Sequence, residues 1–243
     1  MGPPPPAPQC CIPQGHQILG KCVGLIEEFV NRCDGMVVIM SWTYFERLWC
    51  VYEWAGFLAN KEVSDVTLCV GSFLRPSTLQ LYVDSVKNFS VANCQCTKES
   101  DRAILLKKVD AYYVSVDKFE EFARSTGLAV LAMECARRAD KDAKELEIWL
   151  KPWVDMARGM GNEELASVLG QIDPLKWRSQ AQQDSSLGDG AKAHGVWIVG
   201  GDASSRAWQD TFVKKCEAWF VENVAPVLNK VKMTALKGEL SGK

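Results

Sequence analysis

One acidic side chain lies inside the most apolar helical segment of the sequence. In "YFERLWCVYEWAGFLA", residues 44–59, the only charged residue after Arg47 is Glu53. At 100° per residue, the helix face that carries this acid consists of Glu46, Trp49, Cys50, Glu53 and Phe57. The opposite face is apolar as well, and a helix that is apolar on both sides is buried on both sides. We therefore expect Glu53 to lie at least partly out of water.

An unpaired carboxylate in such a place costs several kcal/mol, so Glu53 must be neutral, paired or open to a cleft. The structural interpretation pairs it with Arg47, Arg75 or a backbone amide, as buried acids often are. The functional interpretation places it in a cleft just after the carboxyl end of the preceding strand, where open α/β sheets bind ligands. The residues alone leave both interpretations open.

Two apolar runs on either side of this helix predict the strands that position it. "MVVIM", residues 36–40, and "VTLCV", residues 66–70, are short and rich in β-branched residues. Such runs are typical of parallel strands that are buried on both faces. A helical stripe over residues 17–33 precedes them, so the order is helix, strand, helix, strand, which indicates a βαβ layer.

The remaining chain divides by composition. We expect a disordered Pro-rich leader (1–15), an α/β domain (16–125), a helical extension (126–179), a polar linker (180–195) and a strand with an amphipathic helix (196–236). Within these ranges, residues 73–96 are predicted to be irregular, with room for one short strand. Helices are predicted over 101–113, with Ser100 as the N-cap, and over 118–124. The late helix has an apolar side from Trp208 to Val224, which we expect to dock on the body of the protein.

Composition excludes several classes of protein. The 243 residues are 47% hydrophobic and carry a formal net charge of -2, which gives no electrostatic footprint for nucleic acid. No apolar run approaches the about 18 residues that cross a bilayer, and the leader lacks the features of a secretory signal. We expect a cytoplasmic protein without a membrane span.

The ten cysteines fit a reducing compartment. Most occupy core-like positions, where a reduced cysteine acts as a small hydrophobe; these are Cys22, Cys33, Cys50, Cys69, Cys135 and Cys216. Cys94 and Cys96 could donate thiolates to zinc, but no second pair follows at a suitable spacing. The two histidines, His16 and His194, lie in unrelated contexts, so we expect neither a metal site nor a histidine-based catalytic centre.

The segment "SWTYFERLWCVYEWAGF" resembles the S-x-x-Y-x-x-S-x-W-C-x-x-E-L signature of Toll/interleukin-receptor/resistance (TIR) domains. The matching residues are Ser41, Tyr44, Trp49, Cys50 and Glu53. Arg47 replaces the second serine of the signature, and Trp54 replaces its leucine. The chain is more similar still to a TIR-like group of microbial eukaryotes in which "YFxRLWCVYE" follows an apolar strand. The likeness covers about residues 10–70 well.

The resemblance implies a flavodoxin-like parallel sheet and an intracellular signalling module. It implies action through self-association or contact with other TIR-like domains, without catalysis. The alternative that it implies is an NAD hydrolase, in which Glu53 is the essential carboxylate and Tyr44, Trp49 and Cys50 shape the substrate site. Nicotinamide leaves as a neutral molecule, so one carboxylate that stabilises an oxocarbenium-like transition state is sufficient. NAD would then be a substrate, and no bound cofactor is expected.

One departure from the family concerns the first strand of the sheet. A TIR domain begins with a buried central strand, where this chain has "MGPPPPAPQ". We expect the sheet either to lack its first strand or to receive another segment in that slot. "VWIV", residues 196–199, is the late candidate for it.

Overall fold

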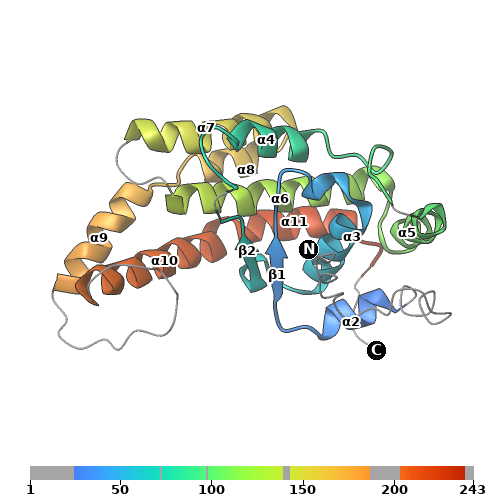
Figure 1. Ribbon diagram of the computed structural model, residues 1–243, viewed down its shortest axis with the longest axis horizontal. Helices are drawn as coiled ribbons and strands as arrows, with labels where there is room; N and C mark the ends of the chain where they lie inside the picture. The colour runs from blue at the N-terminus through green and yellow to red at the C-terminus, as the bar shows by residue number, and fades with distance from the viewer. Residues whose placement is uncertain (1–24, 72, 97, 139–142, 187–202, 239–243) are drawn as a thin grey trace, which may run out of the picture.

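A strand, a helix and a second strand form the part of the fold that the sequence predicts best. The computed structural model describes residues 25–71, 73–96, 98–138, 143–186 and 203–238 (Figure 1). In it, β1 (Met36–Ile39) and β2 (Val66–Cys69) pair in parallel, and α3 (Leu48–Asn60) connects them. The register places Met36 opposite Val66 and Ile39 opposite Cys69. Both predicted strands and the predicted helix between them are confirmed.

Helices make up most of the described chain. The other elements are α2 (Ile26–Arg32), η1 (Tyr44–Glu46), η2 (Val63–Asp65), α4 (Leu79–Lys87), α5 (Glu99–Tyr112), α6 (Val116–Arg138), α7 (Ala143–Gly159), α8 (Glu163–Leu169), α9 (Pro174–Ser186), α10 (Ala203–Asn223) and α11 (Ala225–Ala235). The fold is thus a mixed α/β arrangement with a small parallel sheet. Two strands are present among the described residues, and the flavodoxin-like architecture stays a prediction. The leader and "VWIV" lie outside the described residues.

Three helices differ from the expectation. α4 lies in the stretch predicted to be irregular, although Leu79, Tyr82, Val83 and Val86 have helical spacing and are buried. α6 is one helix of 23 residues, and it continues across the predicted boundary between residues 125 and 126. α9 continues to Ser186, into the range predicted as a polar linker. For α9, packing against α10 outweighs the polar local pattern.

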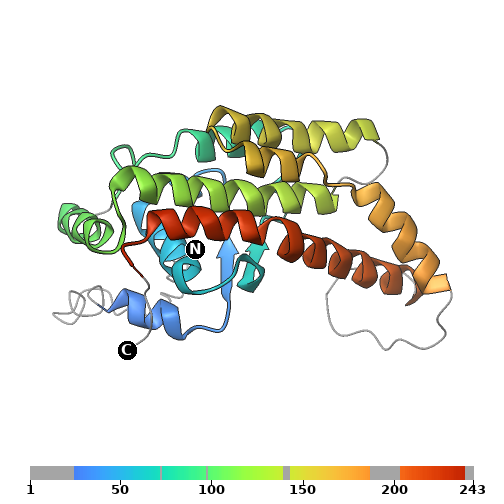
Figure 2. The same cartoon turned by 180° about the vertical axis from the view of Figure 1, so that it is seen from behind.

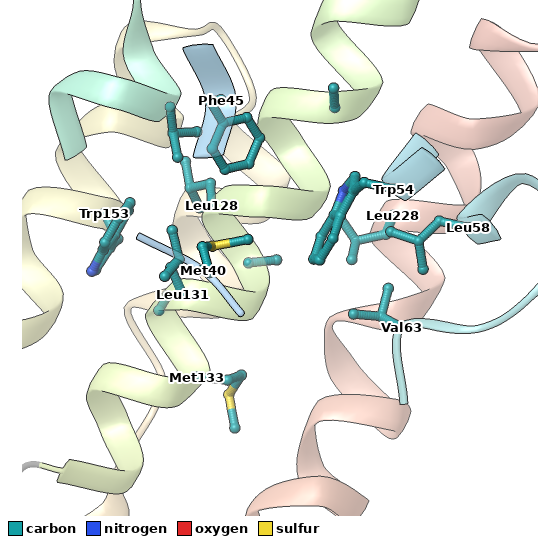
Figure 3. Packing of buried hydrophobic residues seen from close by; sticks show 14 of the residues in the cluster. Met40, Phe45, Trp54, Leu58, Val63, Leu128, Leu131, Met133, Trp153 and Leu228 are labelled. Carbon is teal, nitrogen blue, oxygen red and sulfur yellow. The ribbon is translucent and has the colours of Figure 1, made fainter. Parts of the chain in front are cut away.

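The core lies around α6. Figures 1 and 2 show α6 and α11 side by side along the long axis, with the strands on one side of them. Met40, which directly follows β1, lies close to Leu128 and Leu131 of α6 (Figure 3). The apolar side of α10 is buried too, because Phe212, Cys216, Phe220 and Val224 are almost fully enclosed. The prediction that this stripe docks on the body of the protein is therefore confirmed for the described residues.

Among the described residues, the sheet is covered on one face and open on the other. Val38 and Met40 are 3% and 0% exposed, whereas Val37 and Ile39 are 69% and 75% exposed. The expectation of a strand buried on both faces is therefore wrong for β1 in the described structure. The physical reason is that the described helices contact the sheet from one side, where α3, α6 and α11 lie.

The open face also explains one misplaced cysteine. Cys69 lies on it and is exposed, and Cys33 is exposed just before β1, so the prediction of core positions is wrong for both. Cys135 and Cys216 are buried as predicted, and Cys50 is half-buried.

Within the described ranges, no helix combines the length and the apolar character needed to cross a membrane.

Candidate functional site

The start of α3 is fixed by a distant loop. Arg47 has extended backbone angles and pairs with Gln95 in an isolated parallel bridge. The Leu48 amide donates to the Gln95 carbonyl at 3.2 Å, and the Gln95 amide donates to the Glu46 carbonyl at 2.6 Å. These bonds satisfy a donor at the helix start that has no intrahelical acceptor. The loop therefore sets where the first turn of α3, and the residues on it, lie.

Glu53 is half-buried on the second turn of α3. No residue among the described ranges forms a hydrogen bond or an ion pair with its carboxylate. Burial raises the pKa of this carboxyl, and the nearby positive charge of Arg47 lowers it by a smaller amount. The expected partial burial is confirmed. Of the partners that the structural interpretation offered, Arg47 acts on Glu53 through a longer-range attraction. Burial thus disfavours the charged form of this acid, and raised pKa values of this kind are common at functional sites.

Tyr44 connects η1 to this part of α3. Its hydroxyl donates to the Cys50 carbonyl at 2.9 Å, and its ring meets Trp54 edge to face with centroids 6.3 Å apart. Burial is the main cause that raises the pKa of Tyr44, and the charges that Cys50 and Glu53 can carry raise it further. Tyr44 therefore stays a neutral donor, and its hydroxyl is engaged with the backbone.

Cys50 and Trp49 are half-buried beside Glu53. Burial raises the pKa of the Cys50 thiol, and Arg47 lowers it by less. A thiol in this state is a poor nucleophile, because only the thiolate attacks. Tyr44, Cys50 and Glu53 are thus brought together, and Trp49 lies one helical turn before Glu53 on the same face. The described positions bring together all four residues predicted from sequence, with Arg47 as a fifth.

Three cavities lie among the described residues, and Glu53 lines none of these three. The largest, about 710 Å³, lies between α4, α6 and α7. A second, about 380 Å³, adjoins it along α7, and a third, about 250 Å³, lies between η1 and α4. Among the same residues, no group of three or more His, Cys, Asp or Glu side chains could hold a metal ion.

A charged cluster at Tyr52, the residue before Glu53 on α3, was not predicted. Glu27 of α2 accepts from Lys108 of α5 at 2.6 and 2.7 Å, and the Tyr52 hydroxyl donates to the same carboxylate. Lys108 and Glu27 are 14% and 17% exposed. The two residues are 81 positions apart in sequence, so no local pattern could have paired them. The cluster ties α2, α3 and α5 together.

No family model matches this chain, and no curated protein or solved structure matches it either. The likeness to TIR domains therefore depends on the motif between Ser41 and Glu53 and on the strand, helix and strand around it. A function based on that likeness is a proposal.

Proposed function

We propose that this chain is a TIR-like association module of intracellular signalling, and that it acts through contacts between copies without catalysis. The observation that carries the proposal is the open face of the two-stranded sheet. Parallel strands normally have cover on both faces, because exposing the apolar side chains of either face to water is unfavourable. An uncovered face of such a sheet is a place for a partner.

The open face has the composition of an interface centre. The register pairs Val37 with Thr67 and Ile39 with Cys69, and all four side chains are exposed. None of the four is charged, and three of them are β-branched, so they form a flat and stiff surface. A second sheet that packed face to face on it, about 10 Å away, would bury these side chains.

A second copy of the chain is the partner that fits this face best. Flat, uncharged surfaces are self-complementary, and two copies related by a two-fold axis would bring the same four side chains together. The net charge of -2 gives little long-range repulsion between copies. The face is small compared with the about 1,200–2,000 Å² of a stable interface, so the association should be weak and reversible.

Sedimentation velocity over a wide protein concentration range tests the proposal. The natural chain should shift toward a dimer as its concentration rises from micromolar to near-millimolar. Val37→Lys and Ile39→Lys should each weaken this association by about tenfold or more, because burying an unpaired ammonium is unfavourable. Both side chains are well exposed in one copy, so neither substitution should unfold it.

Met233→Lys is the matched control. Met233 is 68% exposed on α11, so this variant adds the same charge at an equally exposed apolar position away from the sheet. It should associate like the natural chain. A monomer at every concentration would contradict the proposal, and so would equal effects of Ile39→Lys and Met233→Lys.

NAD hydrolysis is the second candidate, favoured by Glu53. Its carboxylate is half-buried, has no bonded partner among the described residues and lies near Tyr44 and Cys50. In this alternative, the natural chain would release nicotinamide from NAD, and the isosteric Glu53→Gln variant would not. The rate would rise with pH, since burial raises the pKa at which the active carboxylate forms. Equal release by both proteins, or none from either, would remove the alternative.

A further inference from the structure

The smallest of the three cavities lies at the carboxyl end of β1, away from Glu53. It has a volume of about 250 Å³, opens to solvent, and is lined by residues of η1, α4 and the loop that follows α4. Ligands of parallel α/β sheets bind beyond the carboxyl ends of the strands. The position is thus one where this kind of fold commonly holds a small molecule. The sequence predicted a cleft at this end of the strand, but with Glu53 in it, and Glu53 does not line this cavity.

The walls of this cavity are held by bonds between distant segments. The Tyr82 hydroxyl of α4 donates to the Met40 carbonyl at 2.9 Å, which fixes α4 to the end of β1. The Cys94 thiol donates to the Phe45 carbonyl at 3.2 Å, which fixes the loop to η1. A site held in this way loses little entropy when a ligand binds.

The floor of the cavity is aromatic. Phe45 and Phe89 line it and are 3% and 2% exposed, and the half-buried ring of Trp42 lines it as well. Trp42 meets the Tyr82 ring edge to face at 6.4 Å, so its orientation is restrained. Aromatic rings attract organic cations, and tryptophan does so most strongly.

The rim of the cavity is acidic. Glu46 and Asp84 line it, and no lysine, arginine or histidine does. The Glu46 carboxylate has no bonded partner among the described residues, whereas Asp84 accepts one bond from Gln80 at 2.8 Å. The nearby Arg102 does not line the cavity, because its guanidinium donates to the Val91 and Cys94 carbonyls.

Uncharged polar groups complete the cavity. Ser85 lines it, and its hydroxyl oxygen is buried and has no hydrogen-bond partner among the described residues. Asn88 and Asn93 lie on the exposed rim. A buried hydroxyl without a partner is uncommon in native proteins and indicates a missing polar group at that position.

From these observations we propose that the cavity binds a small organic ammonium cation that carries a hydroxyl or another polar group. The aromatic floor receives the alkylated ammonium group, the carboxylates of Glu46 and Asp84 balance its charge, and the Ser85 hydroxyl bonds to its polar end. The volume suits a ligand of this size and is below the about 300–1,000 Å³ of sites for drug-sized molecules, so a dinucleotide does not fit. The proposal is independent of the association through the sheet.

Isothermal titration calorimetry of the full chain with choline tests this site. We expect one equivalent of choline to bind. The neutral isostere of choline, in which a carbon atom replaces the ammonium nitrogen, should bind at least about tenfold more weakly, because it keeps the shape and loses the charge. No binding of choline, or equal binding of the isostere, would overturn the proposal.

Two isosteric substitutions place the binding in this cavity. The double variant Glu46→Gln and Asp84→Asn keeps the shape of the rim and should weaken choline binding by about tenfold or more. Glu222→Gln neutralises an exposed acid on α10 and should leave the affinity unchanged. Thermal unfolding of all three proteins checks that the fold is intact. Unchanged affinity in a folded double variant would show that choline binds elsewhere and would overturn the assignment.

Discussion

Glu53 is a carboxylate that the fold accommodates at a cost. A half-buried acid usually gains hydrogen bonds or a counter-charge that offset its lost hydration. Here the described residues provide the attraction of Arg47 and no bond, and burial raises the pKa of the carboxyl. A residue that lowers stability and is still present is a candidate for function, because activity is the common reason for such a compromise.

Replacing Glu53 by glutamine should therefore stabilise the protein at neutral pH. The pKa is raised in the folded state, so ionisation of this acid destabilises the fold as pH rises from the unfolded pKa through the folded one. Glutamine does not ionise, so Glu53→Gln should have the higher free energy of unfolding at neutral pH. The difference should disappear in acid, where the natural carboxyl is protonated. Urea unfolding at several pH values measures it.

Glu28→Gln provides the comparison for that measurement. Glu28 is exposed on α2, and its substitution should change the free energy of unfolding by less than about 0.5 kcal/mol. A Glu53→Gln variant that is less stable than the natural chain at neutral pH would instead show that donors hold this carboxylate. Glu53 would then have a structural role.

At the scale of the elements, α6 holds the segment that carries the motif. The Trp54 indole donates to the Thr126 hydroxyl at 2.8 Å, and Thr126 donates to the Phe122 carbonyl at 2.9 Å. Trp54 is the residue that departs from the leucine of the TIR signature, and its indole bond is buried. The departure thus has a structural reason, because the larger ring reaches α6.

Gly127, the residue after Thr126, allows the Phe45 ring to pack closely against α6. A Cβ atom at this position would lie 2.4 Å from the Phe45 ring, which is itself buried. Gly127→Ala should lower the free energy of unfolding by about 1–2 kcal/mol, because an overpacking cost of about 1–3 kcal/mol exceeds the better helix propensity of alanine. Chemical denaturation measures the change.

Gly56→Ala is the matched substitution within α3. No described atom lies within 4 Å of a Cβ atom there, so alanine should stabilise the helix by about 0.5–1 kcal/mol. Equal effects at Gly56 and Gly127 would contradict the close contact between α6 and Phe45.

The sequence predicts those elements whose pattern is local. β1, β2 and α3 follow from apolar runs and from one helix without charges other than Glu53. α4 was not predicted although Leu79, Tyr82, Val83 and Val86 have helical spacing, so the sequence contained a local signal for it that was missed. The bond between Trp54 and Thr126 joins positions 72 residues apart, so periodicity cannot reveal it.

The same limit applies to the sites. The sequence placed Tyr44, Trp49, Cys50 and Glu53 together because one helix and the turn before it carry them. The cavity between η1 and α4 combines Glu46 with Asp84 and Phe89, and these residues meet only after α4 has packed. The pattern "MVVIM" likewise identifies a strand but does not say which of its faces lacks cover.

For the whole molecule, one continuous core joins the sheet to the C-terminal helices. It includes residues from Ile26 of α2 to Ala235 of α11. The open face of the sheet stands apart from this core, because Val37 and Ile39 are exposed while their neighbour Val38 is enclosed. The central claim is that copies of the chain meet at this face.

The alkylation rate of Cys69, followed peptide by peptide with mass spectrometry, tests that claim most directly. Cys69 lies on the open face opposite Ile39, and Cys33, which is also exposed, lies before β1 and serves as the internal reference. We predict that raising the protein concentration slows alkylation of Cys69 relative to Cys33 in the natural chain, and that Ile39→Lys abolishes the slowing. A ratio of the two rates that stays constant from micromolar to near-millimolar protein would contradict association through this face.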